Sequence, residues 1–394
     1  MKKTWNGKIA LLFKGMVLAL VWFQALTAIV WGIANIASIQ PFAQTQNYLS
    51  VKECLQTVGY DSVGYAYFIV ACRVLQRITR IPFYAVAYLL QMMLCNGFIH
   101  SGCAAFIRGT TGKKAPHGSV ALVTVLILTN PFMWQMVFAM LPDALAFSLV
   151  IYGIGNAFLF VKTIGKGRNF SFAFANLFSL FLLLYLQRYS FYVCIGCTFV
   201  ICFAGLIKIL IKKEARNEDN LARELVFAFG MAGMLALALF VVISDTQWIS
   251  AVTMDKTTLK KVFSGALSPF VLAKKEYPFG DNVNALYLNI MWQKRPALTY
   301  FYVSATRLGF AICIPCLIIK GLFERIGTKE KVAGIIRNAL FFGLLILATA
   351  VYGAFVSPAE FDFRYFFVPG MTWAVWGASL YGVSENKETT GEEE

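Results

Sequence analysis

The amino-acid sequence predicts an all-α integral membrane protein that crosses the bilayer many times. Of its 394 residues, 59% are hydrophobic and only 14% are charged, whereas a soluble domain has about 25% charged residues. The hydrophobic residues gather in long blocks, such as the uncharged stretch from Val17 to Ala37. The basic residues gather in the short segments between these blocks. All three observations are typical of a polytopic bundle, because each helix needs about 20 apolar residues to span a bilayer.

About ten transmembrane helices are expected. The third block is interrupted by Asn130-Pro131, and a proline inside a helix removes a hydrogen bond and kinks or breaks it. The fourth and fifth blocks are short for a span, which is tolerated where helix ends line a cavity. The predicted spans are 9–37, 82–106, 119–141, 143–161, 170–187, 189–211, 224–244, 299–319, 338–356 and 365–383.

A single transmembrane domain, residues 1–384, follows from this count. The charge pattern distinguishes the rest of the chain, because residues 385–394 are polar and mostly acidic. Such a composition does not bury enough apolar surface to fold, so the tail is expected to be disordered and cytoplasmic.

The net charge of +15 would suggest a nucleic-acid partner in a soluble protein. Here the basic residues lie in short loops, which favours the positive-inside bias of membrane proteins instead. With the N-terminus in the cytoplasm, the loops near Lys113, Lys213 and Lys329 lie on the same side. An even number of spans returns the C-terminus to the cytoplasm. We therefore expect a multi-pass protein of the cell membrane that binds no nucleic acid.

Two longer segments, about 38–81 and 245–298, are expected on the outer side. The first contains a helical stretch, Val63–Arg80, in which Arg73, Arg77 and Arg80 share one face. That pattern is typical of an amphipathic helix at the membrane surface. Cys54 and Cys72 flank this region, and a disulfide between them in an oxidising compartment is a minor alternative. Most of the nine cysteines lie in apolar blocks, and two histidines give a zinc site little support.

The unusual polar residues concentrate on the predicted outer side. Asp61 and Asp143 are carboxylates, and Arg188, Arg307 and Arg364 are arginines near the outer ends of spans. A structural alternative exists for each. Asp143 follows a proline at a helix start, where a carboxylate satisfies free backbone N–H groups. The arginines could reach lipid headgroups, with neighbours such as Tyr365 as interfacial anchors.

Arginines and carboxylates together indicate a definite chemistry. The planar donor fork of arginine matches the oxygens of a phosphate. A carboxylate can accept the proton of an acceptor hydroxyl, or orient a metal, while a glycosidic carbon is attacked. Such a site would hold a phosphorylated lipid and activate an acceptor.

Three short motifs carry a resemblance to a known family. Asp61 precedes the surface helix at 63–80, Pro142-Asp143 follows the proline-broken third span, and Arg364-Tyr365 precedes Pro369 at the start of the last span. This arrangement resembles the GT-C superfamily of polyprenyl-phosphate-dependent membrane glycosyltransferases, which includes protein O-mannosyltransferases and the aminoarabinose transferase of lipid A.

The resemblance implies transfer of a sugar from a polyprenyl-phosphate carrier to a glycan, lipid or protein acceptor of the cell envelope. Asp61 would be the catalytic base and Asp143 its partner. The implied substrate-binding residues are Arg188, Arg364, Tyr365, Arg307, Arg73 and Arg77. The motifs name no cofactor. A divalent metal stays open, because Asp61 is followed by Ser62 where the family often has a second carboxylate.

Two other functions fit the same pattern. An O-antigen polymerase or ligase also has many spans, a large outer loop and outer arginines. A non-enzymatic flippase or transporter of lipid-linked sugars is the alternative of a different class. Transporters place charges at mid-membrane in broken helices, whereas here the charges lie at the outer ends of the spans, which favours an enzyme.

Overall fold

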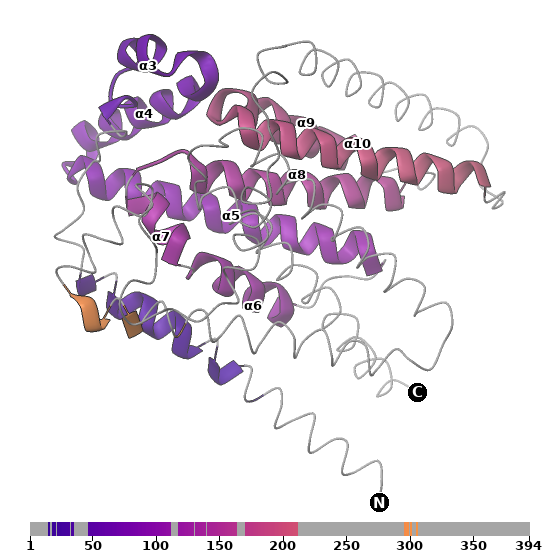
Figure 1. Ribbon diagram of the computed structural model, residues 1–394, viewed down its shortest axis with the longest axis horizontal. Helices are drawn as coiled ribbons and strands as arrows, with labels where there is room; N and C mark the ends of the chain where they lie inside the picture. Colours follow the sequence, from indigo (N-terminus) through magenta and orange to yellow (C-terminus); the bar gives the residue numbers. More distant parts are fainter. Residues whose placement is uncertain are drawn as a thin grey trace, which may run out of the picture.

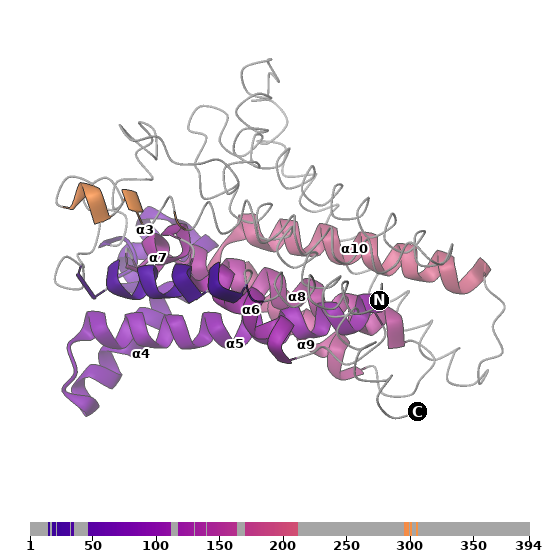
Figure 2. The same ribbon diagram turned by 90° about the horizontal axis from the view of Figure 1, so that it is seen from below.

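The computed structural model is helical, without strands, throughout the residues that it describes. These are residues 46–111, 117–163 except 130 and 139, and 170–211, together with parts of 15–34 and of 295–305. Long helices run side by side along the long axis, and several of the shorter helices lie toward one end (Figures 1 and 2). The predicted all-α class is thus confirmed for this part of the chain.

The helices follow the hydrophobic blocks closely. In chain order they are α3 (Val51–Thr57), the 3-10 helix η2 (Gly59–Ser62), α4 (Val63–Thr79), α5 (Phe83–Thr111), α6 (His117–Leu128), α7 (Pro131–Phe138), α8 (Asp143–Thr163), α9 (Phe170–Leu186) and α10 (Arg188–Ile211). The predicted surface helix corresponds to α4, and the predicted spans between 82 and 211 correspond to α5 through α10.

Two of these helices are long and apolar enough to cross a membrane. They are Phe83–Gly109 in α5, with 27 residues, and Asp143–Thr163, which is α8, with 21 residues. At about 1.5 Å per residue, both exceed the roughly 30 Å hydrocarbon core of a bilayer. The predicted spans at 224–244, 338–356 and 365–383 lie outside the described residues, so the number of spans stays a prediction.

Prolines set two of the helix boundaries. α6 ends at Leu128 and α7 begins at Pro131, which confirms the predicted break. α4 ends at Thr79, and the next residue, Arg80, caps it: its backbone is left-handed (φ 58°) and its N–H donates to the Gln76 carbonyl at 2.8 Å. Pro82 then disfavours helical backbone at the residue before it. The chain therefore turns between α4 and α5.

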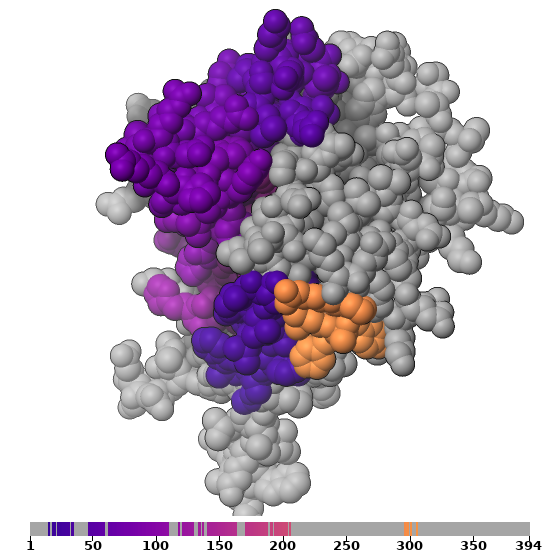
Figure 3. Space-filling view, turned by 90° about the vertical axis from the view of Figure 1, so that its left-hand side faces the viewer, coloured from indigo at the N-terminus to yellow at the C-terminus, as the bar shows by residue number. Residues whose placement is uncertain are grey.

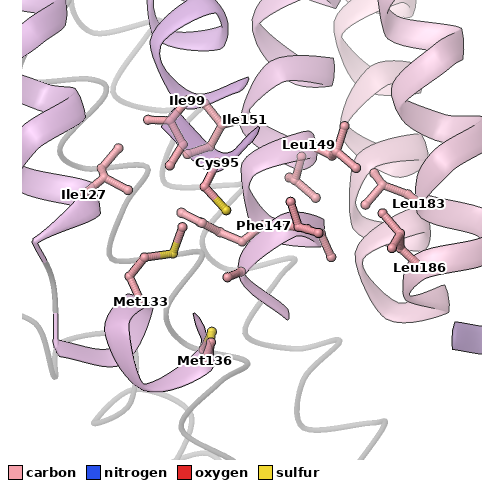
Figure 4. Packing of buried hydrophobic residues seen from close by; sticks show 14 of the residues in the cluster. Cys95, Ile99, Ile127, Met133, Met136, Phe147, Leu149, Ile151, Leu183 and Leu186 are labelled. Atoms are coloured by element: carbon pink, nitrogen blue, oxygen red, sulfur yellow. The ribbon is translucent and has the colours of Figure 1, made fainter. Parts of the chain in front are cut away.

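The core forms where α8 packs between α5 on one side and α9 and α10 on the other. Figure 4 shows Phe147 and Leu149 of α8 between Cys95 of α5 and Leu183 and Leu186 of α9. All five side chains are buried. α8 is thus the central helix of the described bundle, in contact with α5, α9 and α10.

α5 and α8 touch through their backbones. A Cβ atom added at Gly102 would lie 2.7 Å from the Tyr152 Cα, and one added at Gly109 would lie 2.9 Å from the Leu159 nitrogen. A Cβ at Gly155 would meet the Gly102 carbonyl. Small residues at helix contacts are typical of membrane bundles, because close backbones maximise van der Waals packing.

One face of α9 exposes a line of aromatic residues. Phe170, Phe174, Phe178 and Phe181 recur at helical spacing, and their exposed fractions are 58%, 72%, 43% and 60%. Soluble monomers rarely expose a contiguous apolar surface of this kind. The line therefore supports membrane association of the bundle.

Candidate functional site

Asp143 is the one predicted catalytic residue whose side chain is described, and it is buried in a hydrogen-bonded site. It is the first residue of α8 and only 7% exposed. The side-chain amide of Gln187 donates to its Oδ1 at 2.8 Å. The Ser190 hydroxyl donates in turn to the side-chain Oε1 of Gln187. Through Gln187, which lies between α9 and α10, these two hydrogen bonds connect α10 to the carboxylate.

A second chain of hydrogen bonds fixes the turn before Asp143. The Tyr65 hydroxyl in α4 donates to Gln91 Oε1 at 3.0 Å, and Gln91 Nε2 donates to the Leu141 carbonyl at 2.8 Å. Tyr65 and Gln91 are both fully buried. Since Leu141 stands two residues before Asp143, α4 and α5 hold the start of α8 in place.

Together these residues form one polar cluster, comprising Tyr65, Gln91, Asp143, Gln187 and Ser190. It joins α4, α5, α8 and α10 at the end of the bundle where α3 and α4 lie (Figure 1). Buried polar groups are stable only when they are hydrogen-bonded. The cluster therefore specifies one arrangement of these helix ends and one position of the carboxylate.

The electrostatics suit a carboxylate at this position. The N-terminus of a helix carries a partial positive charge that favours an anion, and α8 begins at Asp143. Burial raises the pKa of the Tyr65 phenol well above its ordinary value, and nearby Cys72, Cys95 and Asp143 raise it further. Tyr65 thus stays protonated and keeps its hydrogen bond to Gln91 at any physiological pH.

Asp61 and Arg188 lie on elements that meet at the same end of the bundle. Asp61 is in η2, which packs against α9. Next to η2, a Cβ at Gly64 would lie 3.0 Å from the Tyr185 carbonyl oxygen, two residues before Gln187. Arg188 follows Gln187 directly and begins α10. The side chains of Asp61 and Arg188 lie outside the described part of the chain.

The remaining predicted site residues divide into two groups. Arg73 and Arg77 are exposed on α4, and the Arg73 guanidinium lies 5.4 Å from the centre of the Phe83 ring, within cation–π range. Arg307, Arg364 and Tyr365 lie outside the described residues, so their convergence on Asp143 stays a prediction.

The two glutamines of the cluster were not predicted as site residues from the sequence. Gln91 stands inside an apolar block and Gln187 ends another. A primary amide is costly in an apolar environment without hydrogen-bond partners. A glutamine within a predicted span is therefore a usable signal for a buried polar site, although it does not identify the partner.

The cysteines of the described segments are free thiols, including Cys54 and Cys72, so the minor disulfide alternative is not seen. Burial raises the pKa of Cys72 to about 11 and raises that of Cys54. Thiols in this state are poor nucleophiles and poor metal ligands. Within the same segments, no three His, Cys, Asp or Glu side chains are grouped to hold a metal ion.

Comparisons with protein families, with curated proteins and with solved structures find no match for this chain.

Proposed function

We propose that this chain is a membrane-embedded glycosyltransferase of the GT-C type. It moves a sugar from a polyprenyl-phosphate carrier to a cell-envelope acceptor on the outer face of the membrane. The observation that supports the proposal is the buried, hydrogen-bonded carboxylate of Asp143 at the helix ends that also bear Asp61 and Arg188.

The chemistry requires a base, a positioned carboxylate and a cationic group. Asp61 takes the proton from the acceptor hydroxyl as its oxygen attacks the anomeric carbon. The bond from that carbon to the carrier phosphate breaks, and Arg188 and Arg364 stabilise the phosphate that leaves. Asp143, fixed by Gln187 at 2.8 Å, orients the acceptor and favours the positive charge that develops on the sugar.

The proposed topology has about ten spans with both termini in the cytoplasm. Asp61 and Tyr277 are then outside, whereas Lys113, Lys213 and Lys329 are inside. Reporter fusions after these five positions should report those sides. A cytoplasmic Tyr277 would contradict the proposal, because the acidic and basic site residues would then be divided between two faces of the membrane.

Binding of the carrier phosphate by Arg188 and Arg364 is a direct test of the proposed function. Arg188→Ala is expected to weaken binding of undecaprenyl phosphate to the purified protein in nanodiscs, measured by native mass spectrometry. Loss of a charge-assisted contact costs about 1.5–3 kcal/mol, or roughly ten- to hundredfold in affinity. Arg188→Lys should recover only part, since an ammonium lacks the planar fork. Arg364→Ala and Arg364→Lys should behave in the same way.

Arg108→Ala provides the matched control, because Arg108 is exposed in the last turn of α5. It should bind the carrier as the unaltered protein does. Equal binding by the Arg188 and Arg364 alanine variants would support lipid anchoring by these arginines. Binding of the carrier without any sugar transfer would favour the flippase alternative.

A further inference from the structure

α4 has a buried side that ties it to the bundle. Tyr65, Ile69 and Cys72 are fully buried and belong to the main hydrophobic core. The helix packs against α5 and α9. This side supplies the contacts that hold α4 at the end of the molecule.

A second, separate line of apolar residues on α4 faces outward. Tyr67, Val70, Val74 and Ile78 follow one another at intervals of three or four residues, and their exposed fractions are 60%, 38%, 49% and 72%. Residues at these intervals share one side of a helix. Figure 3, which faces the end of the molecule where α3 and α4 lie, shows both helices at the surface. The bundle thus leaves this line uncovered.

Positive charge accompanies the exposed apolar line. Arg73 and Arg77 are exposed beside it, and Arg80 is exposed at the end of the helix. The segment Val63–Thr79 contains no aspartate or glutamate. The exposed side of α4 therefore combines apolar side chains with arginines on a helix that has no acidic residue, a combination that complements the boundary between lipid tails and anionic headgroups.

We propose that α4 lies in the headgroup layer of the membrane and binds anionic phospholipids. Tyr67, Val70, Val74 and Ile78 enter the acyl boundary, while Arg73 and Arg77 bind lipid phosphates. These two arginines then bind phospholipids of the bilayer and not the sugar donor. Each arginine near an anionic surface contributes roughly fivefold in affinity, so the pair contributes about thirtyfold.

The first test measures lipid retention by the full-length protein. The protein would be placed in nanodiscs of phosphatidylcholine with about 30 mol% phosphatidylglycerol, the anionic lipid. Lipids that stay bound would then be identified by native mass spectrometry. We expect the unaltered protein to retain phosphatidylglycerol and the Arg73→Gln/Arg77→Gln variant to retain about thirtyfold less. Arg108→Gln, exposed on α5, should match the unaltered protein. Equal retention by the double variant would overturn the proposal.

The second test identifies what covers the apolar line. A photo-reactive benzoylphenylalanine at Ile78 is expected to crosslink to phospholipid, and one at the exposed position Lys52 of α3 is expected to crosslink far less. An adduct between two copies of the chain, or none to lipid, would overturn the proposal. Neither test uses a sugar donor. A negative result here leaves the proposed glycosyl transfer intact, and failure of that function leaves this proposal intact.

Discussion

Replacing Asp143 with asparagine is expected to lower sugar transfer by a factor on the order of 10²–10³, the loss typical of removing one fixed electrostatic contact to the transition state. Asparagine keeps the shape of the side chain and an oxygen that can still accept the Gln187 hydrogen bond. It removes the negative charge that the proposed reaction uses. The measurement is transfer of radiolabelled sugar from polyprenyl-phosphate donors in membranes that contain equal amounts of each folded variant.

Asp61→Asn should lower transfer by a factor on the order of 10²–10⁴, because asparagine cannot take the acceptor proton. If the two carboxylates work as one unit, the double variant should lose less than the product of the single losses. Glu53→Gln is the matched control, since Glu53 is an exposed carboxylate in the first turn of α3. It should retain full activity.

Gln187→Leu separates the position of the carboxylate from its charge. It removes the donor to Asp143 and leaves the Ser190 hydroxyl without that acceptor, at a cost of about 1–3 kcal/mol. A smaller loss of transfer than that of Asp143→Asn is expected. Full activity in a folded Asp143→Asn protein would mean that Asp143 only stabilises the start of α8.

Gly102→Leu is expected to destabilise the bundle by more than about 3 kcal/mol, the upper end of ordinary overpacking. The first atom of the new side chain would lie 2.7 Å from the Tyr152 Cα and 2.8 Å from the Ile151 carbonyl. These are backbone atoms of a central helix, so α5 and α8 must separate to accommodate it. A protein with a total stability of about 5–15 kcal/mol loses much of its folded population.

Gly97→Leu supplies the control on the same helix, because a Cβ at Gly97 meets nothing within 4 Å. The thermal unfolding midpoint of each purified variant, followed by tryptophan fluorescence, would be compared with that of the unaltered protein. The Gly102 variant should unfold at a much lower temperature and the Gly97 variant near the original one. Equal midpoints would show that the contact between α5 and α8 is not tight in the folded protein.

The positions of the helices could be predicted from the sequence, but which helices pack against each other could not. Hydrophobic blocks and Pro131 mark α5 to α10 because both act locally along the chain. α5 and α8 are apolar on all sides, so no periodic face indicates a partner. Their contact depends on Gly102 meeting a backbone about 50 residues later, which a local pattern does not contain.

The candidate site, likewise, was predicted only in part. Pro142-Asp143 identifies a carboxylate at a helix start, because proline and acidic residues favour that position. The Gln187 amide that binds it comes from a junction 44 residues away. Hydrogen bonds between distant residues follow from packing, and packing of uniformly apolar helices was not predictable from this sequence.

The length of α9 has a consequence for the surrounding bilayer. Its 17 residues reach about 25 Å, short of a hydrocarbon core of roughly 30 Å. As the predicted fifth span, α9 would therefore be shorter than the bilayer core, and local thinning of the bilayer relieves such a mismatch at a modest cost per ångström. We therefore expect the lipid headgroups beside α9 to lie closer to the membrane centre, near Gln187, the residue after the end of α9. Such thinning would bring the phosphate of the proposed polyprenyl carrier to the depth of Asp143, while the polyprenyl chain stays in lipid.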